Sequence, residues 1–192
     1  QTGELRTFSH AECRFGYRES IFKHEAKDRY AIVGVTFRLD KTPTFRTDYG
    51  DIQKTLAEMG VSTLSIQAVS EAVVRIRRSK LPDPARVGNA GSFFKNPEIS
   101  KNQFDDLKSR FPTMPGYPTS AVTVKVPAGW LIEQAGWKGY REGSVGVHER
   151  QALVLVNYGG GTGVQIKALA EKVQASVREK FGIELVAEVN FI

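Results

Sequence analysis

The sequence predicts an α+β fold, because strand-type and helix-type patterns of apolar residues both occur along the chain. Apolar side chains alternate over residues 31–39, which is typical of a strand with one buried face. Over residues 65–80 they recur every three or four positions, as on the buried face of a helix. Two prolines in residues 81–84 (Leu-Pro-Asp-Pro) favour stiff, extended backbone. We therefore expect a domain boundary there, between residues 1–80 and 81–182.

The composition narrows the class of protein. Of the 192 residues, 41% are hydrophobic and 25% are charged, as in globular proteins that form a core. The net charge of +6 favours anionic partners, either nucleic acid or a small phosphorylated substrate. Basic residues are scattered except at 75–80, which argues against nucleic-acid binding. Cys13 is the only cysteine, so no intramolecular disulfide can form and a reducing compartment is favoured.

The sequence predicts no metal site, membrane span or secretion signal. His10, His24 and His148 lack metal-ligand spacing among themselves and with Cys13. No apolar run reaches the roughly 18 residues that a membrane span needs, and no signal-peptide pattern is present.

The first predicted domain contains one strand and two helices. Residues 1–29 lack strong periodicity and place Arg18 in a polar loop or short helix. Asp51 is a plausible N-cap for a short helix that Gly60 ends, and Ser65 begins a longer helix. The apolar residues expected to be buried are Ala31, Val33, Val35, Phe37 and Leu39 in the strand, and Ile52, Leu56, Met59, Ile66, Val69, Val73 and Ile76 in the helices.

The second predicted domain alternates strands with helices. Ser100 and Gln103 form a capping-box pattern at the start of one helix, and Thr162 lies near the cap of another, which Phe181 and Gly182 end. The apolar stripes of these two helices are Phe104, Leu107 and Phe111, and Ile166, Leu169, Val173 and Val177. A short helix is expected at 128–134, and strands are expected from Ser92 and at 122–126, 152–156 and 185–189, while residues 143–148 are expected to form a short strand or a turn.

Two glycine-rich stretches could contribute to a ligand site. Residues 88–97 (Gly-Asn-Ala-Gly-Ser-Phe-Phe-Lys-Asn-Pro) let the backbone pass close to a bound molecule and predict a Ser92 hydroxyl fixed on a buried strand. The alternative is an ordinary serine at a turn, since no Gly-x-Ser-x-Gly motif is present. Residues 158–163 match no phosphate-binding motif, so a flexible turn is the better interpretation.

Residues 88–97, with the preceding Lys-Leu-Pro-Asp-Pro, resemble the signature of the UDP-N-acetylenolpyruvoylglucosamine reductases, the MurB-type flavoenzymes of bacterial peptidoglycan synthesis. Further stretches fit the same family in the same order, so the resemblance covers nearly the whole chain. They are residues 15–23, 49–51, 128–134, 151–157 and 188–192.

The resemblance implies an α+β fold in which residues 1–80 are the C-terminal part of a flavin-binding module. Residues 81–182 would form a smaller α/β substrate-binding domain, and residues 183–192 a strand returning to the flavin module. The family's flavin-binding portion lies largely N-terminal to residues 15–18, and its glycine-rich flavin diphosphate loop has no counterpart here. The chain is therefore expected to be the C-terminal part of a longer enzyme.

The implied activity is the NADPH- and FAD-dependent reduction of UDP-N-acetylglucosamine enolpyruvate to UDP-N-acetylmuramate, in the cytoplasm. The implied partners are this substrate and the missing N-terminal flavin-binding region, without nucleic acid or membrane, and the protein is expected to be a monomer. The alternative is a non-catalytic fragment that binds the nucleotide sugar without flavin.

The resemblance also implies roles for single residues. Ser92 would donate a proton, Arg18 would bind the substrate carboxylate near the flavin, and Glu188 would polarise that group. Gly91 would approach the cofactor. The expected substrate-binding residues are Tyr49, Lys80, Asn96, Tyr117, Lys138 and Gln151. Judged from the residues alone, each charged group could instead be solvated and each tyrosine could serve in packing.

Overall fold

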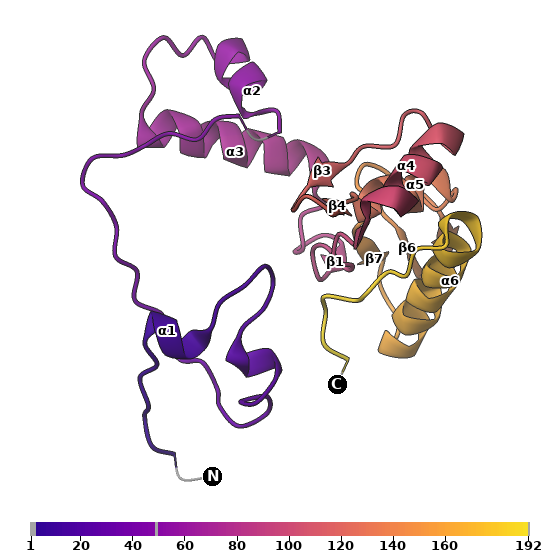
Figure 1. Cartoon of the computed structure of the whole chain (residues 1–192), viewed down its shortest axis with the longest axis horizontal. Helices are drawn as coiled ribbons and strands as arrows, with labels where there is room; N and C mark the ends of the chain where they lie inside the picture. The colour runs from indigo at the N-terminus through magenta and orange to yellow at the C-terminus, as the bar shows by residue number, and fades with distance from the viewer. Residues whose placement is uncertain (1–2, 49, 192) are drawn as a thin grey trace. The chain divides into compact units, whose positions relative to one another are not determined.

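The computed structural model describes residues 3–48 and 50–191 (Figure 1). The chain divides into two compact units, Gln1–Thr44 and Phe45–Ile192. Among the described residues, no helix combines the length and apolar character that crossing a membrane would require.

The first unit is built around short local structure. Helix α1 (His10–Cys13) is capped by Ser9, whose hydroxyl accepts the Glu12 N–H while the Glu12 carboxylate accepts the Ser9 N–H. A single 3-10 turn follows at Ile21–Lys23. Phe8, Phe22 and Tyr30 pack edge to face, with ring centroids 5.0 to 6.4 Å apart. These contacts hold together a unit that has little other core.

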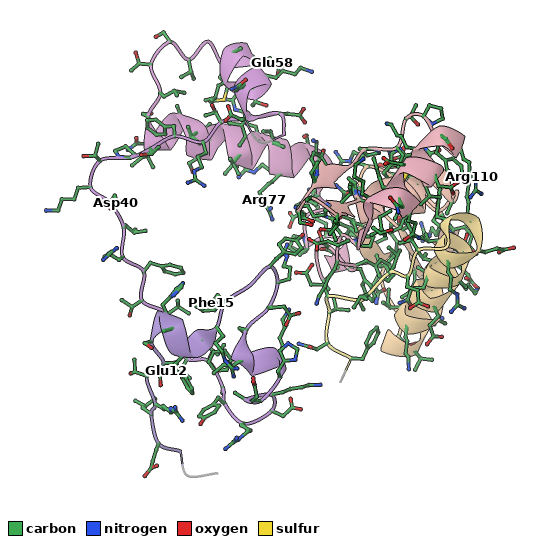
Figure 2. The ribbon with its side chains drawn as sticks, viewed as in Figure 1. Glu12, Phe15, Asp40, Glu58, Arg77 and Arg110 are labelled. Atoms are coloured by element: carbon green, nitrogen blue, oxygen red, sulfur yellow. The ribbon has the colours of Figure 1, made fainter. Side chains whose placement is uncertain are left out.

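The strand predicted at 31–39 is wrong. The segment has no strand pairing, and its apolar side chains are exposed, with Val33 at 81% and Leu39 at 82%. Figure 2 shows the neighbouring Asp40 on a stretch drawn without helix or arrow. The alternation is present, but a strand also needs a neighbour to accept its N–H groups, and none of the described residues supplies one. Alternation of apolar residues alone is therefore not sufficient to make this segment a strand.

Helices α2 (Ile52–Glu58) and α3 (Ile66–Lys80) confirm the two predicted helices of this region and pack on each other (Figure 1). Ile52, Leu56 and Ala72 form their small core. Ser65 caps α3 as predicted, since its hydroxyl accepts the Ala68 N–H. Ile66, expected in the buried stripe, is instead 61% exposed, because it lies on the first turn beyond the reach of α2.

The remainder of the second unit contains two antiparallel sheets. One has the order β1-β7-β6-β5 and the other the order β2-β4-β3. Their strands are Gly88–Asn89 (β1), Glu98–Ser100 (β2), Tyr117–Pro118 (β3), Thr123–Lys125 (β4), Arg141–Glu142 (β5), Val145–Val147 (β6) and Leu155–Asn157 (β7). The α/β pattern expected for residues 81–182 is therefore corrected to α+β, because every strand pair among the described residues is antiparallel.

Three helices cover these sheets: α4 (Lys101–Arg110), α5 (Ala128–Gln134) and α6 (Gly163–Phe181), all close to the predicted bounds. Thr162 and Gln165 form a capping box on α6, and Gly182 ends it with φ 65°. Ser100 caps α4, but Gln103 does not return the bond; its amide donates to the Gly182 carbonyl at 3.3 Å. The core shared by helices and sheets includes Leu107, Leu131, Ile132, Val147, Leu155, Leu169, Val173 and Val177.

Candidate functional site

The candidate site is organised around the backbone of Phe93. Its N–H donates to the Leu153 carbonyl at 2.8 Å, and its carbonyl accepts the Glu188 N–H at 2.8 Å. Phe94 forms an isolated antiparallel bridge with Ala187. Three segments that are far apart in the sequence are thereby joined, and they carry Ser92, Gln151 and Glu188.

Ser92 itself is exposed and lies outside any strand, which corrects the expected position on a buried strand. Residues 185–189 likewise form no strand beyond the bridge at Ala187. Two backbone hydrogen bonds join these segments, from the Glu188 N–H to the Phe93 carbonyl and from the Lys95 N–H to the Val186 carbonyl at 2.9 Å, and they do not extend into a continuous ladder. The anchors are Phe93 and Phe94, which are almost completely buried with ring centroids 5.1 Å apart. They hold the backbone next to Ser92 while its hydroxyl stays accessible.

Gly91 gives the segment its bend. Its φ is 72°, in the left-handed region where a side chain would be strained, although a Cβ there would meet nothing within 4 Å. The Gly91 N–H donates to the Asn89 side-chain carbonyl at 3.0 Å. The glycine is therefore required by backbone conformation, and the open space beside it fits the predicted close approach of a ligand or cofactor.

Asn96 connects the segment to helix α5. Its Oδ1 accepts the Ala128 N–H at 2.9 Å, at the first residue of α5. A Cβ built on the next residue, Gly129, would lie 3.2 Å from Oε1 of Gln151. Asn96 and Gln151 thus both lie at the start of α5. With its oxygen engaged, Asn96 has its NH₂ group as the donor for a ligand.

Among the described residues, the other predicted substrate residues in this unit are Tyr117, Lys138 and Lys80, and each has its own partners. Tyr117 is 58% exposed on β3, opposite Lys125 of β4. The Lys138 ammonium donates to Glu133 at 2.8 Å, and the Lys80 ammonium donates to Asp51 at 2.5 Å. Hydrogen bonding and charge from Lys80 lower the pKa of Asp51. A bound phosphate would have to compete with these carboxylates for both lysines.

Two predicted residues fall outside this geometry. Arg18 belongs to the unit Gln1–Thr44, where its φ of 56° is unusual for a residue with a side chain, and its carbonyl accepts from the Lys23 ammonium at 2.6 Å. Tyr49 lies outside the described residues. The roles of both therefore stay predictions.

Sequence reasoning missed His148, which lies just after β6 and close to Gln151 in the chain. The histidines were considered only as metal ligands, and among residues 3–48 and 50–191 no group of three or more His, Cys, Asp or Glu side chains could hold a metal ion. A histidine directly after an apolar strand and two residues before a tight turn is the available signal, since its ring nitrogen can accept a nearby backbone N–H.

Comparisons with known proteins place the chain in a family. The sequence profile described as UDP-N-acetylenolpyruvoylglucosamine reductase, C-terminal domain, matches residues 83–192. The chain belongs to the UDP-N-acetylenolpyruvoylglucosamine reductase family, which confirms the resemblance.

Several relatives carry that enzyme name. The protein of Chromobacterium violaceum is 57% identical over 188 residues, which cover 98% of this chain and 55% of the relative. Those of Pseudomonas putida and Flavobacterium johnsoniae are each 53% identical, over 99% and 100% of this chain and 56% and 57% of the relatives. The chain thus spans about half the length of the curated relatives it matches.

Proposed function

We propose that this chain carries the substrate-binding half of a UDP-N-acetylenolpyruvoylglucosamine reductase. Together with the length that its relatives have in addition, it reduces UDP-N-acetylglucosamine enolpyruvate to UDP-N-acetylmuramate in cytoplasmic peptidoglycan synthesis, as a monomer. The single observation that supports this best is the pair of hydrogen bonds at Phe93, which assembles Ser92, Gln151 and Glu188 from distant segments.

The proposed domain organisation keeps the boundary at the prolines of residues 81–84. Residues 1–80 belong to the flavin-binding module, residues 81–182 bind substrate, and residues 183–192 return to the module. Support comes from the profile match, which begins at residue 83, and from the separate small core of α2 and α3.

The reaction needs a proton donor and a group that binds the substrate carboxylate. Ser92 holds a proton on its exposed Oγ and delivers it to one carbon of the enol ether. Arg18 binds the carboxylate with its planar guanidinium fork. Glu188 hydrogen-bonds to that group and stabilises charge that develops there, which requires it to be protonated or hydrogen-bonded itself.

The cofactor belongs to the same proposal. FAD, reduced by NADPH, supplies the hydride when bound. Of this chain's residues, Gly91 and Arg18 would lie next to it, and the open space at Gly91 fits such a neighbour. The nucleotide sugar is held by the NH₂ groups of Asn96 and Gln151, with the remaining contacts from Tyr49, Lys80, Tyr117 and Lys138.

The test is Ser92→Ala in the full-length protein that contains this chain. Reduction of the flavin by NADPH should continue, while turnover of the enolpyruvyl substrate should fall by about 10²–10⁴-fold, the contribution typical of a positioned acid. Stopped-flow absorbance separates the two steps. Ser109→Ala is the matched control, because Ser109 is an exposed serine on α4. Near-normal turnover of Ser92→Ala would exclude Ser92 as the acid.

A second candidate function is supported by the length of the chain, about half that of its relatives. By itself, the 192-residue chain would be a nucleotide-sugar-binding fragment without flavin. The absorption spectrum of the purified chain distinguishes the two: a bound flavin supports the complete cofactor site, and its absence with retained binding of UDP-N-acetylglucosamine supports the fragment.

A further inference from the structure

His148 is a polar side chain in an apolar part of the molecule. Of the polar and charged residues that the structure describes, only Thr55 and His148 are buried, and His148 is 6% exposed. Its backbone N–H donates to the Val154 carbonyl at 2.9 Å, which extends the pairing of β6 with β7 by one residue. The ring therefore lies at the base of the turn that connects these two strands.

The imidazole accepts a hydrogen bond inside this turn. The Arg150 N–H donates to Nδ1 at 3.3 Å, so the ring does for residue 150 what an Asp or Asn side chain does in an Asx turn. Burial lowers the pKa of His148, as does the nearby Arg150, while Glu149 acts in the opposite direction. The ring is thus neutral near pH 7, with a lone pair on Nδ1 and its proton on Nε2.

The turn carries two features of the candidate site. The Gln151 carbonyl accepts the Val154 N–H at 3.0 Å, and the Gln151 side-chain oxygen accepts the Leu153 N–H at 3.4 Å. The Leu153 carbonyl in turn accepts the Phe93 N–H beside Ser92. A displacement of residue 150 is therefore passed directly to Gln151, and through Leu153 to the serine segment.

We infer that His148 is a positioning residue: its neutral ring fixes the turn at Arg150 and so directs the Gln151 carboxamide toward the nucleotide sugar. The inference rests on the proposed function for the identity of that ligand. It assigns His148 no contact with substrate, and its effect on binding should act entirely through Gln151.

A double-mutant cycle on the 192-residue chain tests this, with UDP-N-acetylglucosamine as the probe in calorimetric titrations. Gln151→Ala and His148→Phe should each weaken binding about three- to tenfold, the value of one lost hydrogen bond. The double variant should be no weaker than either single variant within about twofold, because both act through one side chain. His148→Asn supplies an acceptor for the Arg150 N–H and should retain most of the affinity. Additive losses, or an Asn variant as weak as the Phe variant, would overturn the inference.

Two controls are needed. The first separates the effect of His148 on Gln151 from a general loss of stability, and the second covers the case in which the proposed ligand is wrong. Val177→Ala destabilises the buried face of α6 without touching the hydrogen bonds of residues 148–154, and it should bind the probe as the unmodified chain does. If the unmodified chain binds no UDP-N-acetylglucosamine, the proposed ligand is wrong for this chain, and ¹⁵N NMR decides the inference separately. His148→Phe should then shift the Gln151 side-chain amide signals, and His148→Asn should keep them near their original positions. Unshifted Gln151 signals in His148→Phe, or a protonated Nδ1 in the unmodified chain at pH 7, would contradict it.

Discussion

At the scale of single residues, Asn96 combines a proposed role in substrate binding with a structural role at the start of α5. The family resemblance implies that Asn96 holds the substrate. In the structure its side-chain oxygen accepts a hydrogen bond from the first N–H of α5. An amide suits both because its oxygen and its NH₂ group act independently. The orientation of the carboxamide is therefore set before any ligand arrives.

We expect Asn96→Ala to lower the free energy of unfolding by about 1 kcal/mol, within the range of about 0.5–2 kcal/mol known for lost helix caps. Asn96→Asp keeps the acceptor and should unfold at nearly the original urea concentration, but it places a negative charge beside the expected phosphates and should weaken nucleotide-sugar binding. Urea unfolding and calorimetry measure the two effects. Asn102→Ala, at an exposed position of α4, is the matched control, and an equal loss in both alanine variants would contradict the capping role.

His148 gives the stability a specific pH dependence. Its pKa in the folded chain lies below the ordinary value of 6.5, so the unfolded chain binds the proton more readily as pH falls below that value. The free energy of unfolding should therefore rise with pH in the window just below 6.5 and level off above it. Asp51 and Glu142 also have lowered pKa values, but their ordinary values of 3.8 and 4.5 place their window at more acidic pH.

Urea unfolding of the unmodified chain and of His148→Asn, between about pH 5 and 7.5, measures this slope. The Asn variant should lack the rise just below 6.5, because it has no proton to bind there. Parallel curves for the two proteins would mean that His148 has the same proton affinity in the folded and unfolded states.

At the scale of elements, the sequence predicted helices better than strands for a physical reason. Ser65, Ser100 and Thr162 each accept an N–H three residues later, so the signals that begin these helices lie within the helices themselves. The alternation at 31–39 is equally clear, but the partner that would complete a strand is not among the described residues. The position of Glu188 next to Phe93 depends on a contact between distant segments, and the pattern of neither segment predicts it.

Helix α6 allows the same substitution to be compared on its two faces. Val177 is fully buried and Val164 is 79% exposed. Val177→Ala should lower the free energy of unfolding by about 1.5–3 kcal/mol, from the lost apolar burial and the cavity that remains. Val164→Ala should stay within about 0.5 kcal/mol of the original value. Urea unfolding followed by circular dichroism measures both, and similar losses would show that α6 packs by a different face.

At the scale of the whole molecule, residues 31–47 differ from the rest of the chain because most of their apolar side chains are exposed and none belongs to either hydrophobic core. This stretch has no helix or strand, and it exposes Phe37 and Leu39 (76% and 82%) beside Asp40 (Figure 2). Exposed apolar surface of this kind is characteristic of an interaction site. The relatives have nearly as much length again as this chain, which is a sufficient source for a neighbouring strand.

Limited digestion with trypsin tests this. Arg38, Lys41 and Arg46 are exposed in this stretch and should be cut first in the 192-residue chain. Lys167, Lys172 and Arg178 lie within α6 and should resist, which makes them the internal control. In the full-length protein the sites at Arg38 and Lys41 should become protected, and mass spectrometry of early fragments identifies the order. First cleavage within α6, or unchanged cleavage at Arg38 in the full-length protein, would contradict the inference that residues 31–47 are an interaction site.

The two-sided bonding of Phe93 also has a kinetic consequence. Helix α6 and the β6–β7 hairpin close short loops and can form early, whereas the partners of Phe93 are Leu153 and Glu188, which lie far along the chain and require long loops to close. Refolding should therefore restore most helical signal before Ser92 and Glu188 meet. A newly made chain would pass through a stage in which its helices have formed and yet it cannot bind its ligand.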